Sequence, residues 1–77
     1  MYDYNTLDDL LKEEVNFVYE LDGYYYVKLK PKCFYENAIW KVDKKTGEVS
    51  YMMFTDFIIN VERFATPVNP KTLKRGS

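Results

Sequence analysis

The pattern of apolar and polar positions predicts a β-hairpin over residues 15–30. This stretch alternates with a period of two, which is typical of strands with distinct faces, and Asp22-Gly23 supplies turn residues. A two-residue turn would place Lys28 opposite Phe17 and mix charge into an apolar face. We therefore predict a three-residue loop that ends at Gly23 and gives one wholly apolar face. Its pairs are Tyr19 with Tyr25, Phe17 with Val27, and Val15 with Leu29.

Three consecutive tyrosines in this hairpin, Tyr24 to Tyr26, must point to alternate faces of the sheet. The predicted register assigns Tyr25 to the apolar face and leaves Tyr24 and Tyr26 on the other. The second face then also carries Val18 and Lys28, a mixed surface with two tyrosines on it.

A second hairpin is predicted over residues 38–53, around a loop from Lys44 to Gly47. The loop suits a type I turn closed by a left-handed Gly47. The predicted pairs are Val42 with Val49, Trp40 with Tyr51, and Ala38 with Met53 on one face, and Lys41 with Ser50 and Ile39 with Met52 on the other.

Two short helices flank the hairpins. Thr6 and Asp9 have the spacing of a capping box, and leucines recur at helical spacing over residues 6–14. Near the other end, Phe57, Val61 and Phe64 lie at i, i+4 and i+7 in residues 56–65, which favours a helix over an extension of the preceding strand. Thr66-Pro67 ends that element.

The predicted fold class is α+β: a short N-terminal helix, a four-stranded antiparallel sheet from two hairpins, a second helix and an extended C-terminal tail. Lys30-Pro31-Lys32 ends the second strand, because proline cannot donate to a ladder. Residues 1–66 form a single domain, and residues 67–77 form an extended or disordered basic tail.

Composition limits the class of protein. A chain of 77 residues permits one domain, and an aromatic content of 18% compensates for a thin core. The net charge of -1 argues against general affinity for nucleic acid or anionic membranes. Cys33 is the single cysteine, which excludes an intrachain disulfide and fits a reducing cytoplasm. No apolar run reaches the roughly 18 residues of a membrane span.

The sequence argues against catalysis. It contains no histidine, the commonest general base, and Cys33 has no base or orienting partner in its pattern. The clustered acids of the first helix fit a solvated face, and the three glycines are isolated, so no phosphate-binding loop is present. We expect no catalytic residues, no metal and no cofactor.

The expected function is that of a small interaction module, an inhibitor or adaptor, that binds a protein partner or a second copy of itself through an aromatic sheet face. Such surface-occupying proteins are typical of phage and other mobile elements. The candidate partner-binding residues are Tyr24, Tyr26, Lys28, Val18, Ile39 and Met52. If the two helices cover opposite faces, this patch disappears. The alternative is a nucleic-acid-associated protein that uses the Tyr/Lys strand and the basic residues from Lys71 to Arg75.

Overall fold

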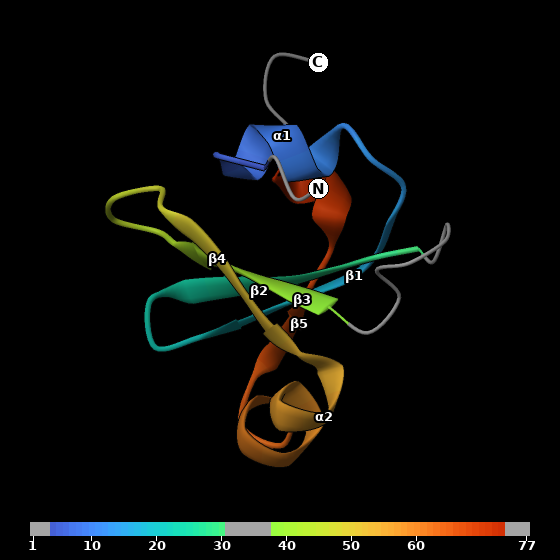
Figure 1. Ribbon diagram of the computed structural model, residues 1–77, viewed down its shortest axis with the longest axis vertical. Coiled ribbons are helices and arrows are strands. Elements are labelled where there is room, and N and C mark those ends of the chain that lie inside the picture. The colour runs from blue at the N-terminus through green and yellow to red at the C-terminus, as the bar shows by residue number, and fades with distance from the viewer. Residues whose placement is uncertain (1–3, 31–37, 74–77) are drawn as a thin grey trace.

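The computed structural model describes residues 4–30 and 38–73 and has an α+β fold built on a five-stranded antiparallel sheet (Figure 1). The elements are α1 (Leu7–Leu11), β1 (Val15–Leu21), β2 (Tyr24–Leu29), β3 (Ala38–Asp43), β4 (Val49–Met53), α2 (Phe54–Phe57), the π-helix η1 (Ile58–Glu62), β5 (Thr66–Val68) and the 3₁₀ helix η2 (Pro70–Thr72). The strand order is β4-β3-β2-β1-β5. The predicted class is confirmed, but the predicted count of four strands is wrong.

The fifth strand lies at the start of the predicted tail. β5 is extended, as expected, but it joins the sheet by pairing with β1, with Val18 opposite Val68. Pro67 is compatible with this place because an outer strand needs backbone donors on one side only. Asn69 then caps η2 by accepting a hydrogen bond from the Lys71 N–H. The chain therefore remains part of the fold through Leu73, whose side chain packs against the core.

The first hairpin has a two-residue turn, so the predicted three-residue loop is wrong. Asp22 and Gly23 have φ angles of 53° and 86°, as both central residues of a type I′ turn require. Leu21 consequently pairs with Tyr24, and Phe17 with Lys28. A bulge between Val15 and Phe17 shifts the register by one residue and brings Val15 opposite Leu29, as predicted.

Lys28 explains why the apolar pattern was misleading. Its side chain is buried on the face of Tyr24 and Tyr26, to which the two-residue turn also brings Phe17 and Tyr19 of β1. The aliphatic stem packs in the core, while Nζ donates to the Leu29 carbonyl at 3.3 Å and lies 5.8 Å from the Phe54 ring centroid. A long lysine can thus occupy a core-facing position, and a mixed face does not exclude a register.

The second hairpin has the predicted register throughout, including Trp40 opposite Tyr51 and Ile39 opposite Met52. Its turn is held locally. The Asp43 carboxylate accepts hydrogen bonds from the backbone N–H groups of Lys45 and Thr46, and Gly47 has the expected positive φ of 80°. The loop between the hairpins, with Pro31 and Cys33, lies outside the described residues.

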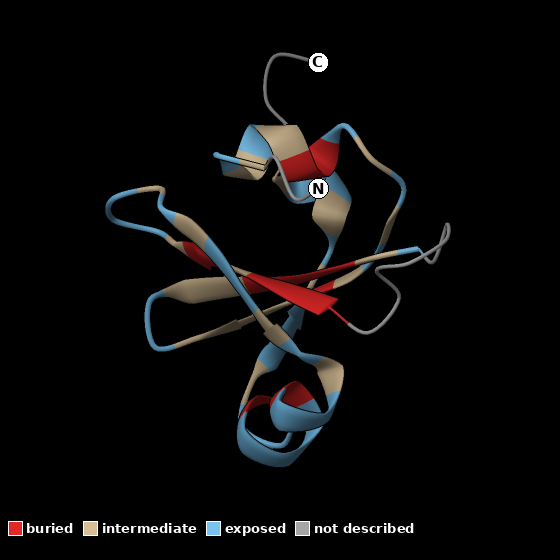
Figure 2. Ribbon diagram, viewed as in Figure 1, coloured by how far each residue is buried: buried red, intermediate tan, exposed pale blue. Residues whose placement is uncertain are grey.

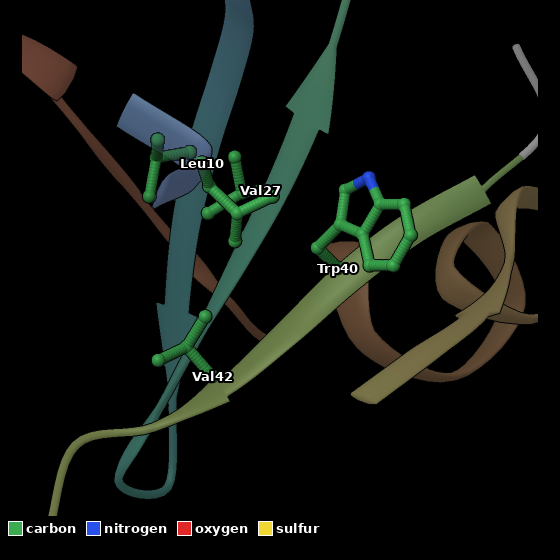
Figure 3. Packing of buried hydrophobic residues seen from close by; sticks show 5 residues of the cluster. Leu10, Val27, Trp40 and Val42 are labelled. Atoms are coloured by element: carbon green, nitrogen blue, oxygen red, sulfur yellow. The ribbon is translucent and has the colours of Figure 1, made fainter. Parts of the chain in front are cut away.

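Helix α1 begins with the predicted capping box. The Thr6 hydroxyl accepts from the Asp9 N–H, and the Asp9 carboxylate accepts from the N–H groups of Asn5 and Thr6. These bonds hold the pKa of Asp9 below its usual value, with the Asn5 N–H making the largest contribution. Leu10 is fully buried and packs toward Val27 on β2, with Trp40 and Val42 on β3 (Figure 3).

The predicted second helix is present, but it begins at Phe54 and continues as the π-helix η1. Phe57 and Val61 are buried, as their spacing indicated. Phe64 is 66% exposed, so the prediction that it lies on the same side of the helix as Phe57 and Val61 is wrong. A π-helix has more residues per turn than an α-helix, so it rotates the following residue away from the buried face.

The two helical regions cover opposite faces of the sheet. Figure 1 shows α1 on one side of the strands and α2 on the other. Two buried clusters result: one with Leu10, Val18 and Trp40 beneath α1, and one with Tyr26, Ile39 and Phe57 beneath α2 and η1. Buried residues accordingly line the middle of the sheet, while much of β4 and η1 is exposed (Figure 2). Both faces of the sheet therefore have a core.

Candidate functional site

The structure brings together most of the partner-binding residues that the sequence predicted. Tyr24, Tyr26, Ile39 and Met52 belong to the cluster beneath α2, and Lys28 lies against Phe54 of the same helix. Val18 is the exception, because the two-residue turn places it opposite Val27 in the cluster beneath α1. Its assignment to the Tyr24 face followed from the wrong register and is corrected here.

That face is mostly a second core. Tyr26 is 5% exposed, and its ring centroid lies 5.9 Å from that of Phe57. Lys28 and Ile39 are buried as well, whereas Tyr24 and Met52 are half-buried. Burial raises the pKa of Tyr26, with smaller contributions from Tyr24 and Asp22. A partner could touch the rim of this face but not its centre.

The aromatic rings of β2 are in contact with lysines of the same chain. Lys41 Nζ lies 4.2 Å from the ring centroid of Tyr24, and Lys44 Nζ lies 4.6 Å from that of Tyr25. Lys44 also forms an ion pair with Glu20, and this hydrogen bond raises the pKa of Lys44. Tyr26 and Lys28 are buried, and lysine Nζ atoms lie over the rings of Tyr24 and Tyr25. Strand β2 therefore does not present a row of open rings for stacking bases.

Strand β4 provides a surface that the sequence reasoning missed. It is an outer strand, and within residues 4–30 and 38–73 no further strand pairs with its outer side. Its sequence, Val49-Ser50-Tyr51-Met52-Met53, contains no charged residue. Tyr51 and Met53, which we assigned to the apolar face, are 53% and 51% exposed. An uncharged outer strand with large exposed side chains is a typical place for another chain to pair.

The hydrogen-bond pattern shows which backbone groups of β4 point outward. The Asp43 N–H donates to the Glu48 carbonyl at 2.9 Å, which makes these residues a hydrogen-bonded pair. Bonded and non-bonded pairs alternate in an antiparallel ladder, so Ser50 and Met52 bond to β3. Val49 and Tyr51 therefore direct their N–H and C=O groups away from β3, toward the outer side. Met53 directs its N–H the same way, while its C=O is the N-cap acceptor of α2.

The opposite edge of the sheet differs in character. β5 has only three residues, and Pro67 at its centre has no N–H to offer. Short strands and prolines are the usual protection of an edge against pairing with other chains. β4 has five residues and neither proline nor charge. The contrast between Pro67 and the uncharged run of β4 was visible in the sequence, but it had no meaning until the strand order was known.

Helical residues that follow β4 extend this exposed apolar surface. Ile58 and Ile59 lie on the outer side of η1, and Ile59 is 61% exposed. They are outside because Phe57 and Val61 occupy the inner side. The chain thus exposes apolar side chains both on its outer strand and on the helical segment that leaves it.

Comparison of the chain with protein-family models, curated proteins and solved structures gave no match. In the part of the chain that the structure describes, no helix has the length and apolar character needed to cross a membrane. In that same part, no group of three or more cysteine, aspartate or glutamate side chains is arranged to hold a metal ion.

Proposed function

We propose that this protein is a non-catalytic interaction module that binds another protein by adding an extended segment of that protein to strand β4. The observation that carries the proposal is the outer side of β4, with which no other strand of the described residues pairs and where Val49, Tyr51 and the Met53 N–H point outward. Main-chain hydrogen bonds supply affinity in this mode of recognition, and alternate side chains supply specificity.

The side chains of β4 support the same mode. Tyr51 packs against Trp40, with ring centroids 5.6 Å apart, and more than half of its side-chain surface is exposed for contact with a partner. Met53 beside it is adaptable in shape and suits contact with apolar partner residues. A strand laid along β4 would cover both. The candidate residues are therefore Val49, Tyr51 and Met53, with Ile58 and Ile59 beyond the end of the strand.

A matched pair of variants at one position tests the proposal. Met53 has φ -71° and ψ 144°, angles that proline adopts without strain, and its N–H points away from β3. Met53→Pro therefore removes an outward donor and leaves the β3 ladder intact. Met53→Ala removes the side chain but keeps the donor, and so separates backbone pairing from side-chain contact.

Peptides selected from a random display library against the wild-type chain serve as the probe. We expect selected peptides to slow amide exchange at Val49 and Met53, and Met53→Pro to abolish binding while Met53→Ala only weakens it. Far-UV circular dichroism checks that both variants fold. Peptides that bind Met53→Pro as tightly as wild type, or that protect amides elsewhere, would contradict the proposal. Affinity that falls steeply with salt for an oligonucleotide probe would support the nucleic-acid alternative.

A further inference from the structure

We infer that residues 66–73, which include β5 and η2, form a strap that detaches from β1 as one unit while the rest of the protein stays folded. The closed strap protects the outer side of β1, and the open strap uncovers it. This edge lies opposite β4 in the strand order, so the inference is independent of the proposed function. It rests on the backbone bonds of β1, on the composition of the two cores and on the local bonds of η2.

The backbone bonds that hold the strap are few and can be assigned. Pro67 lies opposite Tyr19 and has no N–H, so these two residues cannot form a hydrogen-bonded pair. Bonded and non-bonded pairs alternate in an antiparallel ladder. The pairs on either side are therefore the bonded ones: Val18 with Val68, and Glu20 with Thr66.

Toward β2 the pattern of β1 is the reverse. The two-residue turn closes with Leu21 and Tyr24 as a bonded pair, so Tyr19 bonds to Tyr26. Tyr19 thus directs its N–H to β2, whereas its two neighbours along β1 direct theirs to β5. Adjacent amides of one strand are held by two different strands, and the loss of β5 releases only alternate ones.

Both cores are built without the strap. The buried residues of the cluster beneath α1 come from α1, β1, β2 and β3, and those of the cluster beneath α2 come from β2, β3, α2 and η1. The strap contributes the half-buried side chains of Val68 and Leu73, whereas Thr66 and Pro67 are exposed. Detachment therefore uncovers little apolar surface beyond the side chain of Val18. Segments with so few buried contacts open at a lower free energy than the core does.

Local bonds keep the strap together and fix its first end. Asn69 Oδ1 accepts from the Lys71 N–H at 2.9 Å, and the Asn69 carbonyl accepts from the Thr72 N–H at 3.0 Å. These bonds lie within the strap and survive its departure from β1. Ala65 stays behind, because its N–H donates to the Val61 carbonyl at 2.9 Å and its side chain packs in the cluster beneath α2. The strap therefore opens about the peptide bond that follows Ala65.

Amide hydrogen exchange followed by NMR in a series of urea concentrations tests the inference. We expect the Val18 and Glu20 amides to be protected at least about tenfold less than the Tyr19 amide between them, because opening of the strap releases only the first two. Their exchange should also depend weakly on urea, since this opening exposes little surface. Exchange of the Tyr19 amide should rise steeply, because it requires much more of the chain to unfold.

Two variants with the same chemical change locate the opening. Val68→Ala removes a contact that every opening breaks, so it should speed exchange about fivefold at Val18, Tyr19 and Glu20 alike. Val49→Ala, at a half-buried valine on the opposite edge, is the matched control. Its contacts survive the opening of the strap, so it should speed exchange at Tyr19 and leave Val18 and Glu20 unchanged. Far-UV circular dichroism checks that both variants fold.

Either of two outcomes would overturn the inference. The first is equal protection and equal urea dependence of the Val18, Tyr19 and Glu20 amides in the wild-type chain, which would mean that β5 leaves only on global unfolding. The second is an effect of Val49→Ala at Val18 and Glu20 as large as its effect at Tyr19. Neither outcome bears on peptides that bind along β4, so the proposed function is tested separately.

Discussion

The ring of Phe57 covers that of Tyr26, with centroids 5.9 Å apart, and this contact fixes the helical segment after β4 onto the middle of the tyrosine triplet. Phe57 is fully buried and also contacts Phe17, Tyr19 and Phe54. One side chain thus connects the last third of the fold to the first hairpin. It converts a sheet face that could have been a binding surface into a core.

Replacing Phe57 by alanine is expected to lower the free energy of unfolding by about 3–5 kcal/mol, because it empties the centre of the cluster beneath α2. Phe64→Ala is the matched control. Its ring is 66% exposed, so its replacement should change stability by no more than about 0.5 kcal/mol. Urea denaturation followed by circular dichroism measures both. Equal effects of the two substitutions would mean that Phe57 does not anchor the helix.

Tyr26 should make the protein sensitive to alkaline conditions. Burial raises the pKa of Tyr26 above the usual 10.0. Below pH 10.0 the phenol is protonated in both states, and its contribution to stability is complete. As the pH rises further, the unfolded chain loses this proton first, so the free energy of unfolding falls until the pH passes the folded-state pKa.

Tyr26→Phe is expected to retain a larger share of its neutral-pH stability at about pH 11 than wild type does, since phenylalanine has no proton to lose. Urea unfolding at the two pH values gives the comparison. Tyr51→Phe, a half-exposed tyrosine, controls for the loss of a hydroxyl group. Parallel losses of stability in wild type and Tyr26→Phe would contradict the assigned burial.

The first hairpin should depend on Gly23. Its φ of 86° lies in the left-handed region, and a Cβ added there would meet no other atom within 4 Å. Gly23→Ala is therefore expected to lower stability by roughly 1–2 kcal/mol through backbone strain alone. Asp22→Asn should be close to neutral, because asparagine tolerates the positive φ at that position. Thermal unfolding measures both, and a neutral Gly23→Ala would exclude the two-residue turn.

The capping box predicts how α1 responds to acid. The pKa of Asp9 is lowered chiefly by the Asn5 N–H, so its contribution is present above the usual value of 3.8 and is lost as the pH falls through the folded-state pKa. Asp9→Asn should remove that dependence. Thr6→Ala should cost about 1 kcal/mol at neutral pH, because the Asp9 N–H loses its acceptor. Acid titration of unfolding distinguishes the variants, and an unchanged acid profile in Asp9→Asn would contradict the cap.

Local sequence determined the elements whose contacts are close along the chain. Thr6 and Asp9 set the start of α1 because a capping box spans a single turn. Asp43 and Gly47 set the second hairpin, and with it the register of every pair from Val42–Val49 to Ala38–Met53. The alternation of the tyrosine triplet also followed directly, since neighbouring residues of a strand always point to opposite faces.

Tertiary structure decided what covers each face and which strands lie outside. The apolar pattern could not select the register of the first hairpin, because helices cover both faces and the stem of Lys28 is buried like an apolar side chain. Nor could it reveal that β5 pairs with β1 and leaves β4 at the other edge, because those contacts join residues far apart in the chain. Burial depends on such distant neighbours. The sequence alone therefore predicted strands and turns, whereas the tertiary structure decided that Tyr26 is buried and that β4 is an outer strand.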